Sequence, residues 1–465
     1  MKTGSIGTAA AMTVAMLAGG CSLGPQYQRP DVAVPAAWHD DAVDPSAAAT
    51  PSDWWRTFGS EELDAYIAEA GRTNADLAAA LARVREADAL ARVAGAPLLP
   101  TVDATAGAYD ERVQATNSSY ANFHQGSVGL GASYMIDFWG RNRAVREAAV
   151  AAATASRRDQ AVVRITVTTG VATTYFQALE LKERIDVAQG NLRAASSILD
   201  GLRRQQAAGM VTALDVAQQE TTVATLSAAV PPLQQQWRQS IDALAVLVGR
   251  NPETLQDTTT TLGTLTVPTI AAGLPSDLVA RRPDIAEAES MLVAAHANVK
   301  AARAAFFPSI QLTASGGFAS TELSSLLLPG SRVFLLGAGL TQPIFDGGAL
   351  AGQSDYARAR YDELVAAYRK SIVAAFANVE DALVAVRHGA ERVERQQVAV
   401  ERARRAHDFA IAQLRSGTVN VLAVLNTEAA LFTAQDALVQ ARFARFQALV
   451  ALYGALGGGW QAATT

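Results

Sequence analysis

The chain of 465 residues has only five histidines, four lysines and one cysteine, and none of them stands in a motif typical of catalytic, metal or phosphate-binding sites. Its five histidines never pair at metal-ligand spacing, and none of its four lysines follows a glycine as in a phosphate-binding loop. The stretches "GSEEL" and "ASGGF" are not nucleophile elbows. A net charge of −5 and a pI near 5.7 give no nucleic-acid footprint. We therefore expect no enzyme, no cofactor, no metal site and no nucleic-acid partner.

Aromatic residues and long apolar runs are also scarce. Aromatic side chains make up only 6% of a chain that is 50% hydrophobic, so packing must depend on small side chains that let backbones approach closely. Beyond the N-terminus, no stretch of 18 apolar residues occurs without a charge, a proline or glycines. The sequence therefore argues against a bundle of transmembrane helices.

The single cysteine, Cys21, follows Lys2, a short apolar run and small residues, which together are typical of a secretory leader. Its position is similar to a bacterial lipoprotein processing site, and Ser22 fits sorting to the outer membrane. Ala18 stands where leucine is usual, so an ordinary signal peptide that leaves a free thiol is the alternative. We expect Cys21 to carry a covalent lipid, which anchors a chain but does not span the membrane.

The chain contains an internal duplication with an offset of 208 residues. Five anchor pairs share this offset with no net insertion between them: Asp76 and Asp284, Pro100 and Pro308, Gly140 and Gly348, Gly209 and Gly417, and Gly249 and Gly457. The expected organisation is a signal peptide (1–20), a lipidated segment (21–60), a first repeat (61–250), a linker (251–275), a second repeat (276–457) and a tail (458–465).

Each repeat is expected to contain two membrane β-strands. They are expected near 101–110 and 126–137 in the first repeat and near 309–319 and 332–342 in the second. Even-numbered positions in these segments are mostly apolar and odd-numbered positions mostly small or polar, which fits strands with one face toward lipid. A sheet of a soluble sandwich is the alternative.

Long helices are expected before and after each pair of strands along the sequence. One helix is expected over 61–96 and its counterpart over 276–305. The proline-free stretches 141–208 and 349–416 are 68 residues each and would reach roughly 100 Å as continuous helices. The β-branched patch "VRITVTTGVATTYF" could instead form a strand. Returning helices are expected over 212–249 and 420–456, the first broken or kinked at Pro231-Pro232.

Four strands per chain leave two open edges, and lipid cannot satisfy the hydrogen bonds of a strand edge. A dimer would give eight strands, whose side chains fill the interior, whereas a trimer would give twelve strands and leave a conduit. We therefore expect a homotrimer: a twelve-stranded outer-membrane β-barrel, four strands per chain, continued by a long α-helical barrel.

Several motifs resemble those of the outer membrane factors, the TolC-like exit ducts, in the lipoprotein branch that serves resistance-nodulation-division drug pumps. They are "GPQYQRP", "WWRTFGSEELDAYIAEA", "YMIDFWGR", "QPIFDGG" and "ALGGGW", and the likeness covers essentially the whole mature chain. The resemblance implies an α+β duct in the outer membrane of a Gram-negative bacterium, with its helices in the periplasm. It also implies a periplasmic adaptor protein and an inner-membrane pump as partners, and passive conduction of drugs and toxic compounds.

In that family the periplasmic helix tips close like an iris and meet the adaptor. The tip motifs fall on Ala208-Gly209-Met210 and Ser416-Gly417-Thr418, so the resemblance makes Gly209, Met210, Gly417 and Thr418 candidates for adaptor contact. A gate carboxylate matches Asp215, for which a solvated residue that caps a turn is the alternative.

The second tip departs from the family pattern. Ala423 and Asn426 stand where carboxylates are frequent, and Val419 stands where an arginine occurs. We therefore expect a constriction of Asp215, Leu422 and Asn426 in place of a ring of charges.

Two other functions fit parts of the sequence. A type I protein-secretion exit duct would have the same fold. A structural envelope lipoprotein made of long helices would have none of the four alternating segments, which argue against it.

Overall fold

The computed structural model describes residues 26–39, 50–114, 120–255, 260–270 and 272–461, so Cys21 and the expected leader lie outside the described residues. The chain forms two compact units. The strand unit comprises residues 1–31, 83–157 and 287–369, and the helical unit comprises 32–82, 158–286 and 370–465. No helix in the described part of the chain is long and apolar enough to cross a bilayer.

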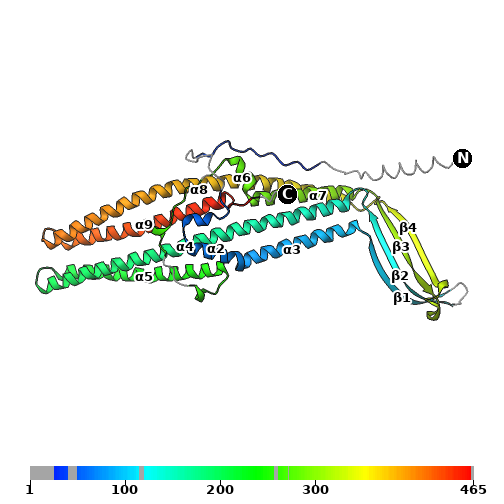
Figure 1. The fold of residues 1–465 in the computed structure, drawn as a ribbon, viewed down its shortest axis with the longest axis horizontal. Coiled ribbons are helices and arrows are strands. Elements are labelled where there is room, and N and C mark those ends of the chain that lie inside the picture. The colour runs from blue at the N-terminus through cyan, green and yellow to red at the C-terminus, as the bar shows by residue number, and fades with distance from the viewer. Residues whose placement is uncertain (1–25, 40–49, 115–119, 256–259, 271, 462–465) are drawn as a thin grey trace. The chain divides into compact units, whose positions relative to one another are not determined.

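The described residues of the strand unit contain an antiparallel sheet of four strands in the order β1-β2-β3-β4 (Figure 1). The strands are β1 (Thr101–Gln114), β2 (Tyr120–Ile136), β3 (Ser309–Ser320) and β4 (Arg332–Thr341). The expected four strands per chain are thus confirmed. The first hairpin is longer than expected because the apolar/polar alternation ends beyond Asp110 while the pairing continues: Arg112 lies opposite Asn122 on the even face and Val113 opposite Ala121 on the odd face. Asp110 there lies opposite His124, with 3.1 Å between Oδ1 and Nδ1.

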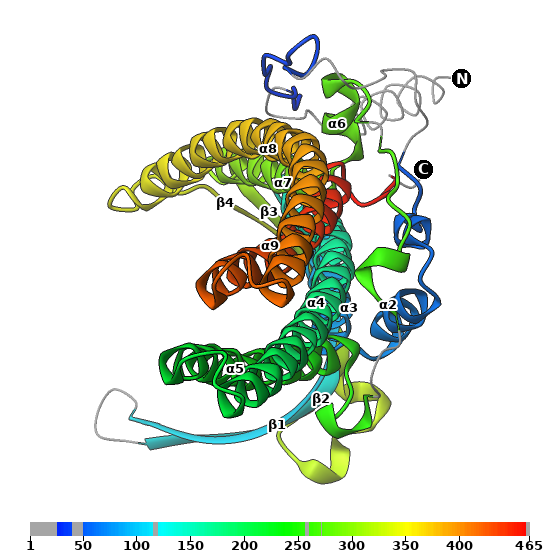
Figure 2. The ribbon, with the colours of Figure 1, turned by 90° about the vertical axis from the view of Figure 1, so that its left-hand side faces the viewer.

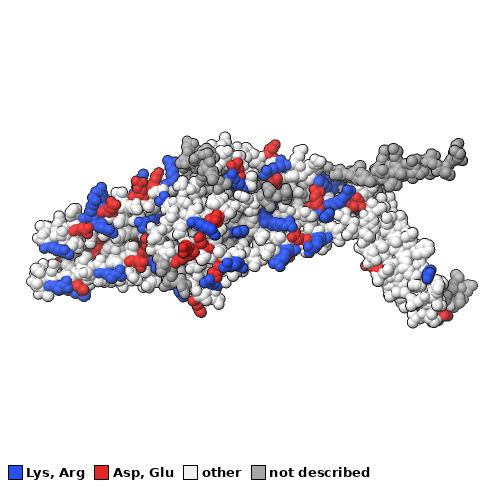
Figure 3. All heavy atoms as spheres, viewed as in Figure 1, with Lys and Arg blue, Asp and Glu red and all other residues white. Residues whose placement is uncertain are grey.

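The pairing register places all even-numbered strand positions on one face of the sheet. Ala104 lies opposite Leu130, Ala132 opposite Ala314, and Ala314 opposite Leu336, so even pairs with even across every strand. The even face is apolar over most of its length and the odd face is mostly small or polar. In Figure 3 the visible surface of the sheet carries few charged side chains, whereas charges are scattered over the helices.

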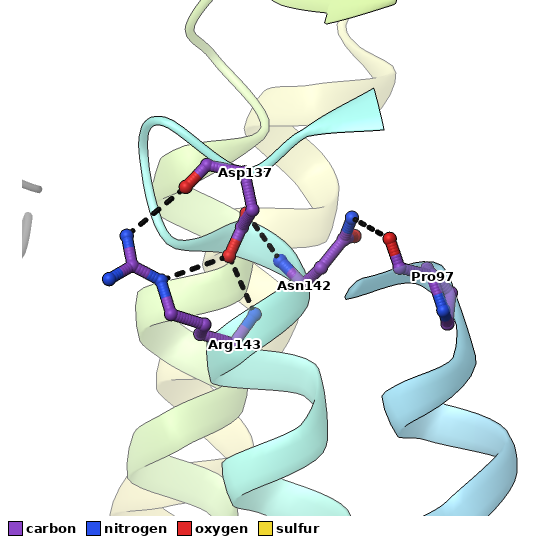
Figure 4. Close-up of polar contacts among 4 residues, drawn as sticks. All are labelled: Pro97, Asp137, Asn142 and Arg143. Atoms are coloured by element: carbon purple, nitrogen blue, oxygen red, sulfur yellow. Dashed lines mark hydrogen bonds and ion pairs between the residues drawn. The ribbon is translucent and has the colours of Figure 1, made fainter. Parts of the chain in front are cut away.

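Polar side chains cap the helices that follow β2 and β4. At the end of β2, the Asp137 carboxylate accepts hydrogen bonds from the backbone N–H of Asn142 and Arg143, both at 2.9 Å (Figure 4). Asp346 after β4 accepts bonds from the N–H of Gly348 and Leu350, and these bonds lower the pKa of its carboxyl. Carboxylates there satisfy helix N-terminal donors that have no intrahelical partner.

The long helices are continuous. They are α4 (Arg141–Ala207), α5 (Ala213–Val248), α8 (Ala349–Arg415) and α9 (Val421–Ala455), and α5 runs beside α4 as α9 runs beside α8 (Figures 1 and 2). The alternative of a strand in "VRITVTTGVATTYF" is wrong, since that stretch lies inside α4. The expected break at Pro231-Pro232 does not occur. Both prolines are exposed, and the carbonyls that lose their N–H partners belong to Ser227 and Ala228, which are exposed too.

The helix expected over 61–96 is two helices, α2 (Glu61–Thr73) and α3 (Ala75–Gly95). The helix expected over 276–305 is likewise α6 (Pro275–Arg281) and α7 (Pro283–Ala304). Each break occurs at an extended residue, Asn74 or Arg282. Asn74 caps the next helix by accepting a bond from the N–H of Leu77, and Arg282 precedes a proline, which disfavours the helical conformation.

One cluster of aromatic residues lies in the core of the helical unit. The short 3₁₀ helix η1 (Trp54–Phe58) inserts Trp54 and Phe58, which are almost completely buried. Trp54 stacks on Tyr453 with ring centroids 4.7 Å apart, and Phe58 contacts Phe176 edge-on at 5.0 Å. This cluster joins the segment before the first repeat to α4 and α9, and such ring pairs contribute stability beyond their buried area.

The same backbone contact occurs once in each repeat of the helical unit. Gly249 follows α5 and Gly457 follows α9, both with a left-handed backbone (φ 71° and 92°). A Cβ on Gly249 would lie 2.5 Å from the carbonyl oxygen of Thr73, and a Cβ on Gly457 would clash with that of Arg281. Each glycine therefore lets the end of a returning helix press against the break between two others.

Replacing Gly249 or Gly457 by alanine should lower the free energy of unfolding, because each site combines a left-handed backbone with a clash. The conformational part alone is about 1–2 kcal/mol. Thermal unfolding followed by circular dichroism measures the loss. Gly201→Ala in α4 is the matched control: its Cβ would meet none of the described atoms within 4 Å, so its midpoint should not fall. Equal midpoints for all three variants would contradict the packing argument.

Candidate functional site: the tips of the helical hairpins

The expected adaptor-contact residues lie on two turns of the helical unit that have the same geometry. Gly209 (φ 73°) joins α4 to α5 and Gly417 (φ 72°) joins α8 to α9. The N–H of Met210 donates to the carbonyl of Gln205 at 2.9 Å, and that of Thr418 donates to Gln413 at 3.0 Å. Both turns are Schellman motifs, which need a residue that adopts positive φ without strain.

The two turns differ in the helix that follows. Thr212 and Asp215 form a reciprocal capping box at the start of α5: the N–H of Asp215 donates to Thr212 Oγ1, and the N–H of Thr212 donates to Asp215 Oδ2 at 2.9 Å. Hydrogen bonds from the Thr212 hydroxyl and N–H lower the pKa of the Asp215 carboxyl. At the start of α9, Asn420 accepts a single bond from the N–H of Ala423. The capping alternative for Asp215 thus describes its contacts in this structure.

The candidate residues are accessible in the chain. Gly209, Met210, Gly417 and Thr418 are all exposed, Met210 by 68%. Leu422 and Asn426 are also exposed on α9, and Asp215 is partly exposed on α5. The two turns therefore present an apolar side chain from the first repeat and a hydroxyl from the second.

A small apolar cluster brings the two tips together. Leu199 and Leu202 of α4, Val216 of α5 and Val421 of α9 are buried against one another. Val216 directly follows Asp215 and Val421 directly precedes Leu422. The packing therefore fixes where the candidate gate residues stand on the surface of the paired hairpins.

Next to this cluster lies a buried polar pair that the sequence analysis missed. Gln219 of α5 and Glu428 of α9 are both completely buried. The side-chain N–H of Gln219 donates to the Ala195 carbonyl at 2.9 Å and lies 3.5 Å from Glu428 Oε2. Gln219 Oε1 and Glu428 Oε1 have no hydrogen-bond partner among the described residues. Burial raises the pKa of the Glu428 carboxyl.

The signal for this pair was present in the sequence. Val421, Val424 and Leu431 form a buried row at helical spacing, and Glu428 occupies the position in that row where an apolar residue is expected. A lone acid in such a row is readily taken for a surface charge when no partner is identified. Only the packing of α9 against α4 and α5 shows that it is enclosed.

An ion-pair network joins α4 to α9 further from the tips. Arg184 contacts Asp436 at 2.6 Å and Glu180 at 3.2 Å, while Arg442 lies 3.4 Å from Glu183. Burial raises the pKa values of Glu180 and Glu183 although each has an arginine partner. The two hairpins thus contact each other through an apolar cluster and a buried acid near the tips. Further from the tips they contact each other through paired charges.

Glu428→Gln should make the packing of the tips independent of pH. Because the packed state raises the Glu428 pKa, it holds a proton that a hydrated state releases, and each pKa unit corresponds to about 1.4 kcal/mol. The stability of the wild-type tip is therefore greatest below the ordinary glutamate pKa and falls as the pH rises toward the raised value. Hydrogen-exchange protection of α5 and α9, corrected for intrinsic rates, should fall in the wild type as the pH rises above the ordinary glutamate pKa, and this fall should be absent in Glu428→Gln.

Glu220→Gln is the matched control, because Glu220 is the exposed counterpart of Glu428 in the first repeat. Its pH dependence should equal that of the wild type. A Glu428→Gln profile that still falls with pH would show that another group is responsible.

Comparison with known proteins agrees with this architecture. Residues 66–250 and 274–458 match the family "Outer membrane efflux protein". The pyoverdine export outer membrane protein OpmQ of Pseudomonas aeruginosa is 40% identical over 97% of this chain and 96% of its own. The toluene efflux pump outer membrane protein TtgC of Pseudomonas putida is 33% identical over 96% and 94%. The open-state MtrE outer membrane channel of Neisseria gonorrhoeae superposes with a TM-score of 0.86, at 28% identity over 95% and 99%. The resemblance seen in the sequence is confirmed: the chain belongs to the outer membrane efflux protein family.

Proposed function

We propose that three copies of this chain form one duct, which accepts small organic molecules from a periplasmic adaptor and an inner-membrane pump and releases them outside the cell. Its role as an outer membrane exit duct follows from its family. Beyond this role we propose the number of copies, the partners, the lipid anchor and the gate. In this role the chain itself catalyses nothing, and the pump supplies the energy.

The observation that carries the proposal is the amphipathic sheet with two open edges. Phe334 and Leu336 of β4 are 85% and 76% exposed, and Leu130 of β2 is 59% exposed, all on the even face. Such a face suits lipid, and the small polar odd face suits a water-filled interior. Twelve strands from three chains would satisfy the edges and leave a conduit.

The relatives indicate which class of molecule the duct carries. The names of the two relatives cited above specify pyoverdine and toluene, which are small organic molecules and not proteins. This favours small-molecule efflux over the alternative of type I protein secretion. Identity of 40% over nearly the whole chain makes a small organic compound our proposed cargo for this chain.

The lipid anchor at Cys21 is supported by the segment that follows it. Arg29 Nε donates to the Tyr368 hydroxyl at 2.7 Å, and its Nη2 lies 3.3 Å from Glu289 Oε2. The ring of Tyr27 contacts His296 edge-on at 5.8 Å. The chain is thus clamped onto α7 and α8 within a few residues of Cys21, in the same unit as the sheet.

Native mass spectrometry of the detergent-extracted protein tests copy number and anchor together. We expect the mass of three chains, each lacking residues 1–20 and carrying acyl groups at Cys21. Cys21→Ser should remove the acyl groups and leave the trimer, because the strand edges, and not the lipid, drive closure. An unlipidated monomer from the wild-type chain would overturn the proposal.

The gate is tested at Asp215, which we propose narrows the closed tips together with Leu422 and Asn426. Asp215→Ala should let the idle duct leak ions, seen as raised single-channel conductance in a lipid bilayer. Unchanged conductance would remove Asp215 from the gate.

Two variants separate the charge of Asp215 from its capping role. Thr212→Ala keeps the carboxylate but loses the capping hydroxyl, a change that typically costs about 1 kcal/mol of helix stability. Asp215→Asn keeps an acceptor oxygen but loses the charge. A gate that depends on charge leaks with Asp215→Asn and stays closed with Thr212→Ala; the reverse result assigns the closure to the cap.

A further inference from the structure

A basic cavity lies in the strand unit, where the segment before the first repeat crosses α7 and α8. Its volume is about 490 Å³. Three of the lining side chains are cations, Lys300 and Arg303 of α7 and Arg358 of α8. The described lining residues include one acid, Asp362. The cavity therefore carries an excess of positive charge.

Arg303 is the cation of this cavity that has no anionic partner in the chain. Among the described residues, none forms an ion pair or a side-chain hydrogen bond with it, although it is partly buried. Lys300 Nζ lies 3.2 Å from Glu147 Oε1, and Arg358 Nη1 lies 3.9 Å from Asp355 Oδ1. A guanidinium that is partly withdrawn from water loses hydration, which an anion on its planar fork of donors restores.

The fold that the two repeats share does not require these cations. A shift of 208 residues carries Arg303 to Gly95 and Arg358 to Val150. The first repeat thus builds the same succession of helix, two strands and helix with neither guanidinium. The two arginines of the second repeat are therefore explained by what the cavity holds and not by packing.

Two short segments connect the cavity to places where lipid is expected. Helix α7 leads directly into β3 (Figure 1), and Arg303 precedes Ser309 by six residues, which span at most about 20 Å. Gln26 lines the cavity and follows Cys21 by five residues, which span at most about 18 Å. Basic side chains beside the hydrocarbon region reach the level of the lipid headgroups.

We propose that this cavity binds the phosphodiester of an anionic membrane phospholipid, with Arg303 as its principal contact. The proposal rests on the outer membrane duct proposed above. A phosphodiester carries one negative charge and two free oxygens, which match the two parallel donors of a guanidinium. The glycerol and acyl chains of the lipid then extend from the cavity toward the hydrocarbon that the sheet faces.

The other lining residues favour a lipid over a free phosphate ion. Gln26 and Gln28 offer amides for the hydroxyl and ester oxygens of a glycerol, and Val299 and Tyr361 offer apolar surface. The His296 ring lies 5.9 Å from that of Tyr361, and burial lowers the pKa of His296, so it adds no charge at neutral pH. A free phosphate would contact the cations and leave the amides and the apolar wall unused.

Native mass spectrometry tests the proposal on the delipidated, detergent-solubilised protein titrated with dioleoyl phosphatidylglycerol. We expect one lipid per chain and much weaker binding of dioleoylglycerol, which has the same acyl chains but no phosphate. Arg303→Gln should weaken the binding of phosphatidylglycerol roughly tenfold, because it removes a charge-assisted contact. Arg358→Gln, on the exposed side of α8, should weaken it too and serves as a second variant if Arg303→Gln alters folding.

Arg92→Gln is the matched control. Arg92 is exposed on α3 in the same unit and is the first-repeat counterpart of Lys300, so its loss removes the same charge outside the cavity. Its affinity for phosphatidylglycerol should equal that of the wild type. An equal loss in Arg92→Gln and Arg303→Gln would reveal general attraction to surface charge and overturn the proposal. Unchanged affinity in both Arg303→Gln and Arg358→Gln would place the lipid elsewhere and overturn it as well.

The remaining outcomes separate the source of the phosphate and the duct itself. Displacement of the lipid by an equal concentration of inorganic phosphate would assign the cations to a free anion and overturn the lipid. A mass of three chains with no bound phosphatidylglycerol overturns the lipid site and leaves the duct in place. A mass of one chain with no bound phosphatidylglycerol overturns both.

Discussion

The hydrogen-bonding groups along the outer edges of β1 and β4 are the constraint on which the structure depends. In hydrocarbon these groups must be paired, and the described chain offers no further strand to pair them. Closure by copies of the same chain, as proposed above, would satisfy them and make the four-stranded sheet part of a barrel wall.

The helices meet a different requirement, which is to pack closely over a great length. Alanine-rich faces do this in α4 and α8, whereas large rings occur where several segments must converge on one point. Trp54, Phe58, Phe176 and Tyr453 mark that point in the helical unit. The glycines after α5 and α9 allow close packing in the same way, because each lacks the Cβ that would keep a helix end away from the neighbouring backbone.

The periodicity of apolar residues and the internal duplication made much of this fold predictable from the sequence. Alternation located the strands and their faces, and the constant offset located corresponding turns such as Gly209 and Gly417. The helix breaks at Asn74 and Arg282 were missed, because one depends on a side-chain cap and the other on the residue before a proline, while apolar spacing continues across both. Pro231-Pro232 shows the converse. Of the break or kink expected there, the break does not occur, because exposed carbonyls that lose their N–H partners can bond to solvent without ending the helix.

The enclosed acid could not be predicted because burial of Glu428 is a property of three helices together. That enclosure also gives the tips a thermodynamic link between packing and protonation. Gln219 reaches from α5 to the α4 backbone and to Glu428 on α9, so separating the hairpins there admits water to the carboxyl. Hydration favours ionisation, and ionisation in turn opposes repacking. The counterpart of Glu428 in the first repeat, Glu220, is exposed. The two repeats therefore share a fold, but near the tips the second repeat places a buried acid, Glu428, where the hairpins pack against each other.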